Sequence, residues 1–128
     1  MKDTLGLNAG RFRTNEVQIK GSDHKPPHFN DVELHIEELF KWVNRNTHKH
    51  TPLVSAAILH HWLTWIHPFS DGNGRVSRLI LNFYLLQKGY PEIIIKITER
   101  DNYYNSLIKA DKGDLSQLIE LLILLIFL

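Results

Sequence analysis

The residues best suited to chemistry lie together in one short segment between His67 and Arg78. It reads His-Pro-Phe-Ser-Asp-Gly-Asn-Gly-Arg-Val-Ser-Arg. Gly72, Asn73 and Gly74 accept unusual backbone dihedral angles and stand directly before an expected helix. Their consecutive N–H groups are expected to form a concave anion site, reinforced by the positive end of that helix. The turn therefore predicts a phosphate-binding site.

Charged side chains flank this turn. Arg75 and Arg78 are three positions apart, so both guanidinium groups leave the same side of the first helical turn. Two arginines near a helix N-terminus oppose the helix dipole, which indicates that a polyanion compensates them. Asp71 offers a hard carboxylate oxygen suited to Mg²⁺, and His67, with an unperturbed pKa of about 6.5, suits a general base. The set predicts a base, a metal carboxylate and a triphosphate site without the lysine of a P-loop.

This segment is expected to connect two helices, because apolar residues recur at helical spacing on both sides of it. Asn30 and the pair Thr51-Pro52 are start signals for the first two helices. The helices are expected over residues 31–45, 52–66 and 73–88, between Thr98 and Gly113, and from Asp114 into the apolar end of the chain. In the third helix, the apolar residues on one side are Val76, Leu79, Ile80, Phe83 and Leu86.

An extended segment is expected ahead of the helices. Over residues 12–20, Val17 and Ile19 alternate with polar residues and Thr14 favours a strand. Residues 21–23, Gly-Ser-Asp, close the segment with turn chemistry. The sequence thus predicts a mainly α protein with one small strand or hairpin.

Composition limits the class of protein. The chain has 128 residues, enough for one domain, and it contains no cysteine, which excludes disulfides and thiolate catalysis. There are 15 Lys and Arg against 14 Asp and Glu, so the formal net charge is +1 and no nucleic-acid partner is expected.

Eight histidines are the one compositional oddity. His60 and His61 are adjacent and so point to different faces of a helix, and there is no His-Glu-x-x-His motif. We therefore expect no zinc site built on these histidines. His60 is expected to be a hydrogen-bonded core residue behind the catalytic segment.

Residues 67–78 resemble the signature of the Fic family, His-x-Phe-x-(Asp/Glu)-Gly-Asn-Gly-Arg-x-x-Arg, and fill every specified position. The similarity extends from about Gly10 to Asp114. It implies a single Fic domain over residues 1–128, with a helical bundle over about 30–127 and a small β-hairpin flap over about 11–24. Fic domains transfer the AMP part of ATP to a hydroxyl group of a target protein. The resemblance thus implies a protein adenylyltransferase that uses ATP and Mg²⁺ and modifies a Ser, Thr or Tyr side chain.

The resemblance also implies roles for individual residues. His67 would deprotonate the target hydroxyl, Asp71 would hold Mg²⁺ against the α- and β-phosphates, and Phe69 would anchor the loop. The phosphates would be bound by the N–H groups of Gly72, Asn73 and Gly74 and by the side chains of Arg75 and Arg78.

Further contacts are implied on the adenine side and at the flap. Tyr103 and Tyr104 would lie beside adenine and ribose, although Tyr104 also fits an apolar stripe of the core. Asp111 stands where relatives often place an Asn that touches the nucleotide. Val17, Gln18 and Ile19 of the flap would pair with an extended target segment, the alternative being that these side chains only pack on the domain.

Several alternatives to AMP transfer stay open. Removal of AMP and phosphocholine transfer use related signatures, and a binding module could keep the fold without turnover. Phosphate transfer is disfavoured, because the kinase-like branch departs from Gly-Asn-Gly-Arg.

Regulation and location are left open by the sequence. Many Fic proteins carry an inhibitory helix with (Ser/Thr)-x-x-x-Glu-(Gly/Asn). Ser116 to Glu120 match this pattern, which then fails at Leu121. Three alternatives for regulation stay open: an inhibitory subunit, an inhibitory helix missing from this chain, or a domain without inhibition. The first ten residues show no signal peptide, so the cytoplasm is expected, with an injected effector as the other option. The apolar C-terminal end is too short to span a membrane. It is expected to be a buried helix, the alternatives being a truncated boundary or a homo-oligomer contact.

Overall fold

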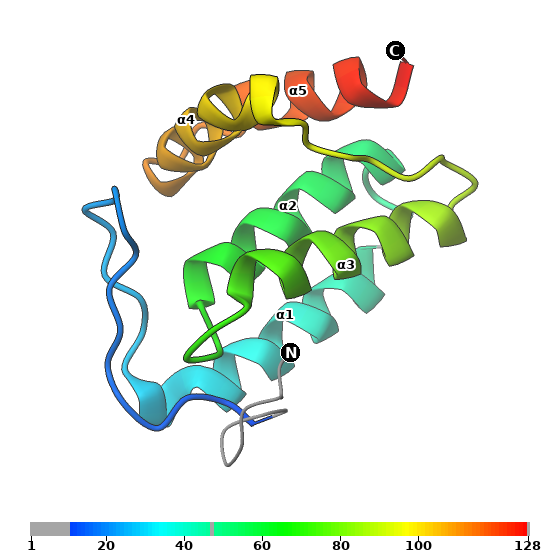
Figure 1. Cartoon of the computed structure of the whole chain (residues 1–128). Helices are drawn as coiled ribbons and strands as arrows, with labels where there is room; N and C mark the ends of the chain where they lie inside the picture. Colours follow the sequence, from blue (N-terminus) through cyan, green and yellow to red (C-terminus); the bar gives the residue numbers. More distant parts are fainter. Residues whose placement is uncertain (1–10, 47, 128) are drawn as a thin grey trace.

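The computed structural model describes residues 11–46 and 48–127, and its regular elements are helices (Figure 1). The five α-helices are α1 (Val32–Asn46), α2 (Pro52–Ile66), α3 (Asn73–Gln87), α4 (Arg100–Asp111) and α5 (Ser116–Phe127). Short 3-10 turns, η1 (Phe29–Asp31) and η2 (Ile97–Glu99), precede α1 and α4. The mainly α class is confirmed. None of these helices is long and apolar enough to cross a membrane.

The central helix is α2, which contacts α1, α3, α4 and α5 (Figure 1). Thr51 caps its start, since the Thr51 hydroxyl oxygen accepts the N–H of Val54 at 3.4 Å, and Pro52 opens the helix as predicted. The largest fully buried apolar side chains are Leu39 of α1, Ile66 of α2, Leu81 and Leu85 of α3, and Leu118 and Leu122 of α5. This packing fixes the end of α2 beside the start of α3.

The helix starts predicted at Asn30 and Thr98 are wrong. Asn30 lies inside η1, and the Nδ1 atom of His28 accepts its N–H at 3.1 Å, so His28 takes the capping role. Thr98 lies inside η2, and α4 begins after Glu99 without a side-chain cap. In both places a 3-10 turn precedes the α-helix, which moves the helix start one or two residues along the chain.

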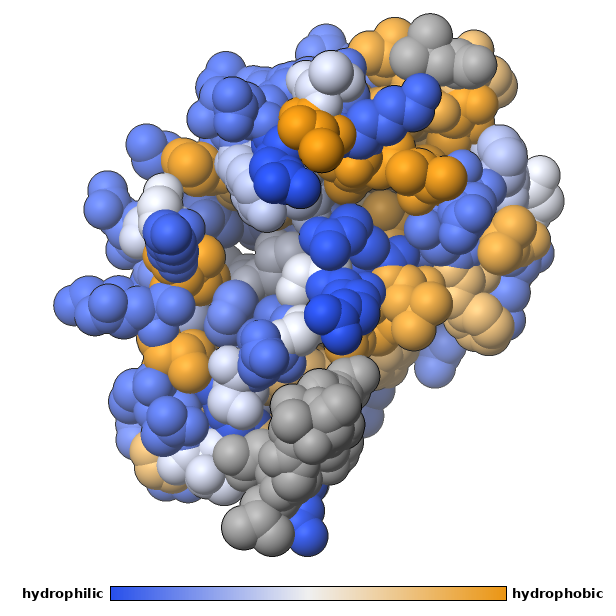
Figure 2. Space-filling model, viewed as in Figure 1, coloured by the Kyte–Doolittle hydropathy of each residue, from blue (hydrophilic) through white to orange (hydrophobic). Residues whose placement is uncertain are grey.

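The buried face of α3 differs from the apolar side of the sequence pattern. The buried residues are Asn73, Ser77, Leu81, Tyr84 and Leu85. Leu79, Phe83 and Leu86 are exposed at 68%, 63% and 58%. Figure 2 shows hydrophobic side chains also gathered over α5 and the segment that leads to α4. The first half of α3 thus packs through hydrogen-bonded polar residues.

Residues 11–28 form an irregular loop, which we call the flap loop, that runs along the molecule and returns to η1 (Figure 1). No strand is present in the described part of the chain, so the predicted strand and β-hairpin flap over residues 11–24 are wrong. A turn closes the tip, where the N–H of Ser22 donates to the carbonyl of Ile19 at 3.1 Å and Gly21 has φ +80°.

The physical reason lies at the base of the flap loop. There the carbonyls of Asn15 and Pro27 bind the guanidinium group of Arg13, at 3.1 and 2.5 Å, instead of pairing across the loop. Pro26 and Pro27 also have no N–H to donate to a ladder. A side chain thus joins the two limbs where a hairpin would use backbone hydrogen bonds.

Candidate active site

His67 ends α2 in an unusual backbone conformation. Its φ and ψ are +51° and +63°, and its N–H donates to the carbonyl of Leu63 at 3.0 Å. Within the described residues, it is the only non-glycine residue with a positive φ. A left-handed conformation is costly for a residue with a β-carbon and persists where the surroundings impose it, often at functional sites.

The side chain of Asn73 closes the loop that follows. Its Nδ2 donates to the carbonyl of Phe69 at 2.7 Å, and its Oδ1 accepts the N–H of Phe69 at 2.8 Å. The Phe69 ring packs against Phe12, with the ring centroids 5.8 Å apart, but Phe69 is only partly buried, and its role as the anchor of the loop stays a prediction. The sequence assigned Asn73 a backbone role only, and its side chain proves to be structural as well.

The start of α3 has the features of an anion site. Gly72 precedes the helix with φ +80° and no side-chain cap. The first N–H groups of a helix have no acceptor within it, so those of Asn73 and Gly74 are available to a ligand. A β-carbon built at Gly74 would lie 3.0 Å from Nη1 of Arg78, so the glycine leaves room for that guanidinium group.

A cavity of about 460 Å³ opens beside this turn and brings most of the predicted site together. The predicted residues that line it are Ile19, His67, Asn73, Gly74, Arg78, Tyr103 and Tyr104. Sequence reasoning missed Lys20, Gly21 and Ser22 at the tip of the flap loop, together with Thr64. The local sequence of the flap-loop tip carries no signal for this position, because the path of the loop is irregular.

Some predicted residues do not line the cavity. They are Val17, Gln18, Asp71, Gly72 and Arg75, of which Gln18, Asp71 and Arg75 are exposed. Glu120, the glutamate of the partial inhibitory pattern, lies on α5 and does not line the cavity either.

Comparison with known proteins identifies the family. Residues 1–85 match the model of the Fic/DOC family. The chain belongs to this family. It is 39% identical over 114 residues to "Protein adenylyltransferase Fic" of Nematostella vectensis, covering 88% of this chain and 26% of that protein. The chain therefore spans about a quarter of the length of the curated relatives it matches.

Solved structures have the same fold. Fic-1 (aa134–508) from C. elegans superposes with a TM-score of 0.78 at 35% identity, over 88% of this chain and 33% of that one. A Fic domain containing signaling protein from Bacteroides thetaiotaomicron gives a TM-score of 0.82 at 29% identity, over 91% of this chain and 51% of that one. The Fic fold is thus present, with an irregular flap loop in this chain.

The environment of His67 in this Fic domain suits a base. Burial is the main cause that lowers the pKa of His67 below its ordinary value, and the positive charge of Arg13 lowers it further. A hydrogen bond with the backbone of Thr64 opposes both effects. The imidazole is therefore neutral at neutral pH and able to accept a proton.

A buried pair supports the cavity wall behind Arg78. His60 is fully buried, and its Nδ1 and Nε2 lie 3.1 Å from the Ser77 carbonyl and 2.7 Å from the Tyr103 hydroxyl. Because a carbonyl can only accept, Nδ1 carries the proton and Nε2 accepts from Tyr103. Burial lowers the pKa of His60 to about 4 and raises that of Tyr103 to about 12. The expectation of a hydrogen-bonded core histidine is confirmed.

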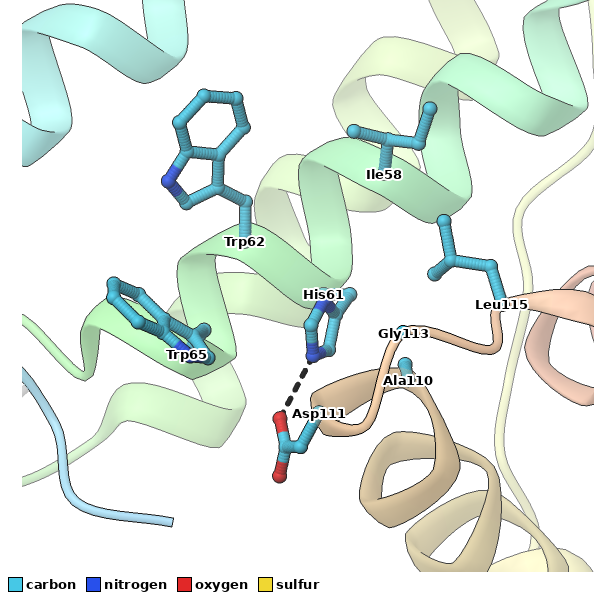
Figure 3. A pocket seen from close by; sticks show the side chains of 8 residues that line it. All are labelled: Ile58, His61, Trp62, Trp65, Ala110, Asp111, Gly113 and Leu115. Carbon is cyan, nitrogen blue, oxygen red and sulfur yellow. Dashed lines mark hydrogen bonds and ion pairs between the residues drawn. The ribbon is translucent and has the colours of Figure 1, made fainter.

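Asp111 borders both the main cavity and a second one of about 350 Å³ between α2 and the α4–α5 turn (Figure 3). Its Oδ1 lies 2.8 Å from Nε2 of His61, and the two side chains point toward each other across the gap between the helices. The rest of the lining includes Ile58, Trp62, Trp65 and Leu115. The Asp111 carboxylate thus has a protein partner, His61.

Proposed function

We propose that this chain is a protein adenylyltransferase, which transfers AMP from Mg-ATP to a hydroxyl group of a target protein. One observation carries the proposal. A single cavity is lined by a neutral histidine, by the start of α3 with Arg78, and by two tyrosines of α4. These groups suit a general base, a phosphate site and an adenine site. The relatives that bear the name protein adenylyltransferase Fic support the same activity.

The chemistry follows from this placement. The triphosphate lies at the start of α3, where N–H groups and Arg78 stabilise the developing charge, and Arg75 adds a second cation in the same helical turn. His67 takes the proton of the target hydroxyl as its oxygen attacks the α-phosphorus. The new P–O bond forms while the bond from the α-phosphorus to the oxygen of the β-phosphate breaks, and pyrophosphate leaves.

Asp71 fits the expected Mg²⁺. Its Oδ1 accepts the N–H of Gly72 at 2.8 Å, while its Oδ2 makes no hydrogen bond with the described part of the chain. Mg²⁺ is commonly held by one or two carboxylates together with substrate phosphates and water. The described residues contain no cluster of three or more potential metal ligands, in keeping with an ion shared with the nucleotide. The ion would neutralise phosphate charge.

The flap loop offers a place for the target. Among the described residues, the backbones of Val17 and Gln18 have no hydrogen-bond partner, and the Ile19 side chain lines the cavity. An extended target segment that includes the accepting Ser, Thr or Tyr could pair with these backbone groups by strand addition. Such pairing would bring the hydroxyl toward the cavity that both Ile19 and His67 line.

Labelled ATP tests the proposal. The purified chain is incubated with target-containing lysate, Mg²⁺ and ATP labelled at the α- or the γ-phosphate, with the His67→Ala variant as the control. Protein-bound label only from the α position, absent in the variant, is the expected result. Label only from the γ position would identify a kinase. Bound nucleotide with no labelled protein would favour a binding module.

A further inference from the structure

Arg13 lies at the base of the flap loop, and its side chain is fully buried. Its guanidinium group donates to four backbone carbonyls. Nε donates to His67 at 2.7 Å, and Nη2 to Pro27 at 2.5 Å and to Ile66 at 3.3 Å. Nη1 donates to Asn15 at 3.1 Å. One side chain thus joins both limbs of the flap loop to the end of α2.

The backbone of Arg13 also binds the end of α2. Its N–H donates to the carbonyl of Pro68 at 2.9 Å, so the carbonyls of His67 and of the next residue are both held by Arg13. The last carbonyls of a helix have no partner within it and form the negative end of its dipole, where a cation is favourable. The planar guanidinium group, with five donors, can satisfy several of them at once.

These hydrogen bonds lie on both sides of His67, the residue of the site with a left-handed backbone. The left-handed φ of His67 needs support from its surroundings. Holding the carbonyls of Ile66 and His67 fixes the peptide planes on both sides of the His67 α-carbon. The direction in which its imidazole leaves the backbone is thereby fixed as well.

We propose that Arg13 is the positioning residue of the catalytic base: it holds His67 in the left-handed conformation that aims the imidazole into the nucleotide cavity, and it fastens the flap loop to the same point. This inference rests on the proposed function, because it takes His67 as the base of the transfer.

The charge of Arg13 has a second effect, on the protonation of His67. The positive charge acts with burial to keep the imidazole neutral, and His24 acts in the same direction. The Thr64 backbone opposes them, and Arg78 lines the same cavity. Glu16, whose side chain is 61% exposed, lies 3.6 Å from Nη1 of Arg13 and offsets part of its charge. Geometry and charge can therefore be separated by substitution.

Two variants separate them. Arg13→Lys keeps the charge and loses the forked donors, whereas Arg13→Met loses both. Since a misplacement of about 1 Å can cost 10²-fold in rate, we expect AMP transfer to fall by about 10²-fold in Arg13→Met and by at least tenfold in Arg13→Lys. The Kd for ATP should change by less than about threefold in both. The control is Arg11→Met, the same change at an exposed residue of the same loop, which should leave transfer unchanged.

The pKa of His67, measured by NMR titration of histidine-labelled protein, is the readout that a merely structural role would not move. It should rise in Arg13→Met and stay low in Arg13→Lys. Folded variants with unaltered transfer and an unaltered His67 pKa would overturn the inference.

If a variant does not fold, NMR measurements on the wild-type protein test the inference instead. The Nε–H of Arg13 should exchange slowly with solvent and show a coupling through the hydrogen bond to the carbonyl carbon of His67. Rapid exchange without that coupling would contradict the inference. These NMR measurements need no turnover, so they separate a failure of this inference from a failure of the proposed adenylyltransferase activity.

Discussion

Both backbone polar groups of Phe69 are hydrogen-bonded to one side chain, the amide of Asn73, at 2.8 and 2.7 Å. The loop between them carries Asp71 and Gly72, so the amide sets the shape of the segment that meets the phosphates. Asn73→Ala should lower the free energy of unfolding by about 1–3 kcal/mol, because the partly buried N–H and carbonyl of Phe69 lose their partners. It should also lower AMP transfer by more than tenfold. Urea denaturation and a transfer assay measure the two effects.

Asn82 provides a matched control for this prediction. Its amide makes the same pair of hydrogen bonds, to the N–H and carbonyl of Ile93, at 2.8 and 3.0 Å, and Asn82 does not line the cavity. Asn82→Ala should therefore lower stability by a similar amount and leave transfer within about twofold of the wild type. Equal losses of transfer in the two variants would show that Asn73 acts only through stability.

Gly74 leaves room for the guanidinium group of Arg78, and filling that room should weaken ATP binding. In Gly74→Ala the new β-carbon would meet Nη1 of Arg78 at 3.0 Å, so the flexible end of the arginine must move. We expect a Kd for ATP about tenfold higher, or about 1.4 kcal/mol, by calorimetry. In an Arg78→Ala background the same change should have little further effect. Additive losses would mean that Gly74 acts independently of Arg78.

The proposed role of His67 predicts both a rate and a pH profile. His67→Ala should lower transfer by about 10²–10⁴-fold and leave the Kd for ATP unchanged. The pKa of His67 is lowered, mainly by burial. The base therefore stays neutral below pH 6.5, and kcat/KM should fall only as the pH drops through the lowered pKa. An acid limb at or above pH 6.5 would contradict this assignment.

Local signals in the sequence were sufficient to predict the five helices, to within a few residues at their ends, and the turn between α2 and α3. Thr51-Pro52 and Pro68 mark the two ends of α2, whose predicted and observed limits agree at residues 52–66. Local signals were insufficient where a residue's partners are distant in the sequence. The carbonyls that bind the guanidinium group of Arg13 lie up to 54 residues away, and no local pattern reports such a contact. The strand pattern at Val17 and Ile19 likewise lacked a partner, because Arg13 binds the carbonyls at the base of the loop.

His60 should make the fold sensitive to acid. Burial lowers its pKa from 6.5 to about 4 in the folded protein, so between these values the unfolded chain binds a proton that the folded protein does not. The free energy of unfolding should therefore fall as the pH drops from 6.5 to 4, by about 3 kcal/mol from this group. Urea unfolding at a series of pH values measures the slope.

Two variants test the assignment of that slope. In His60→Gln the pH dependence should be clearly weaker, although stability at pH 7 falls through the lost hydrogen bonds with Ser77 and Tyr103. His48→Gln, in an exposed loop, should keep the wild-type slope. A His60→Gln protein with the full slope would assign the acid sensitivity to other groups.

The unexpected orientation of α3 can be tested by comparing its two apolar sides. An amphipathic pattern would turn Leu79 and Phe83 toward the core, but both are mostly exposed, while Leu81 and Leu85 are buried. Leu79→Ala should therefore change the free energy of unfolding by no more than about 0.5 kcal/mol, whereas Leu81→Ala should lower it by about 2–5 kcal/mol. The two substitutions remove the same atoms two positions apart, so they are matched in chemistry and helix propensity. A larger loss of stability in Leu79→Ala than in Leu81→Ala would mean that α3 is rotated, so that Leu79 and Phe83 face the core.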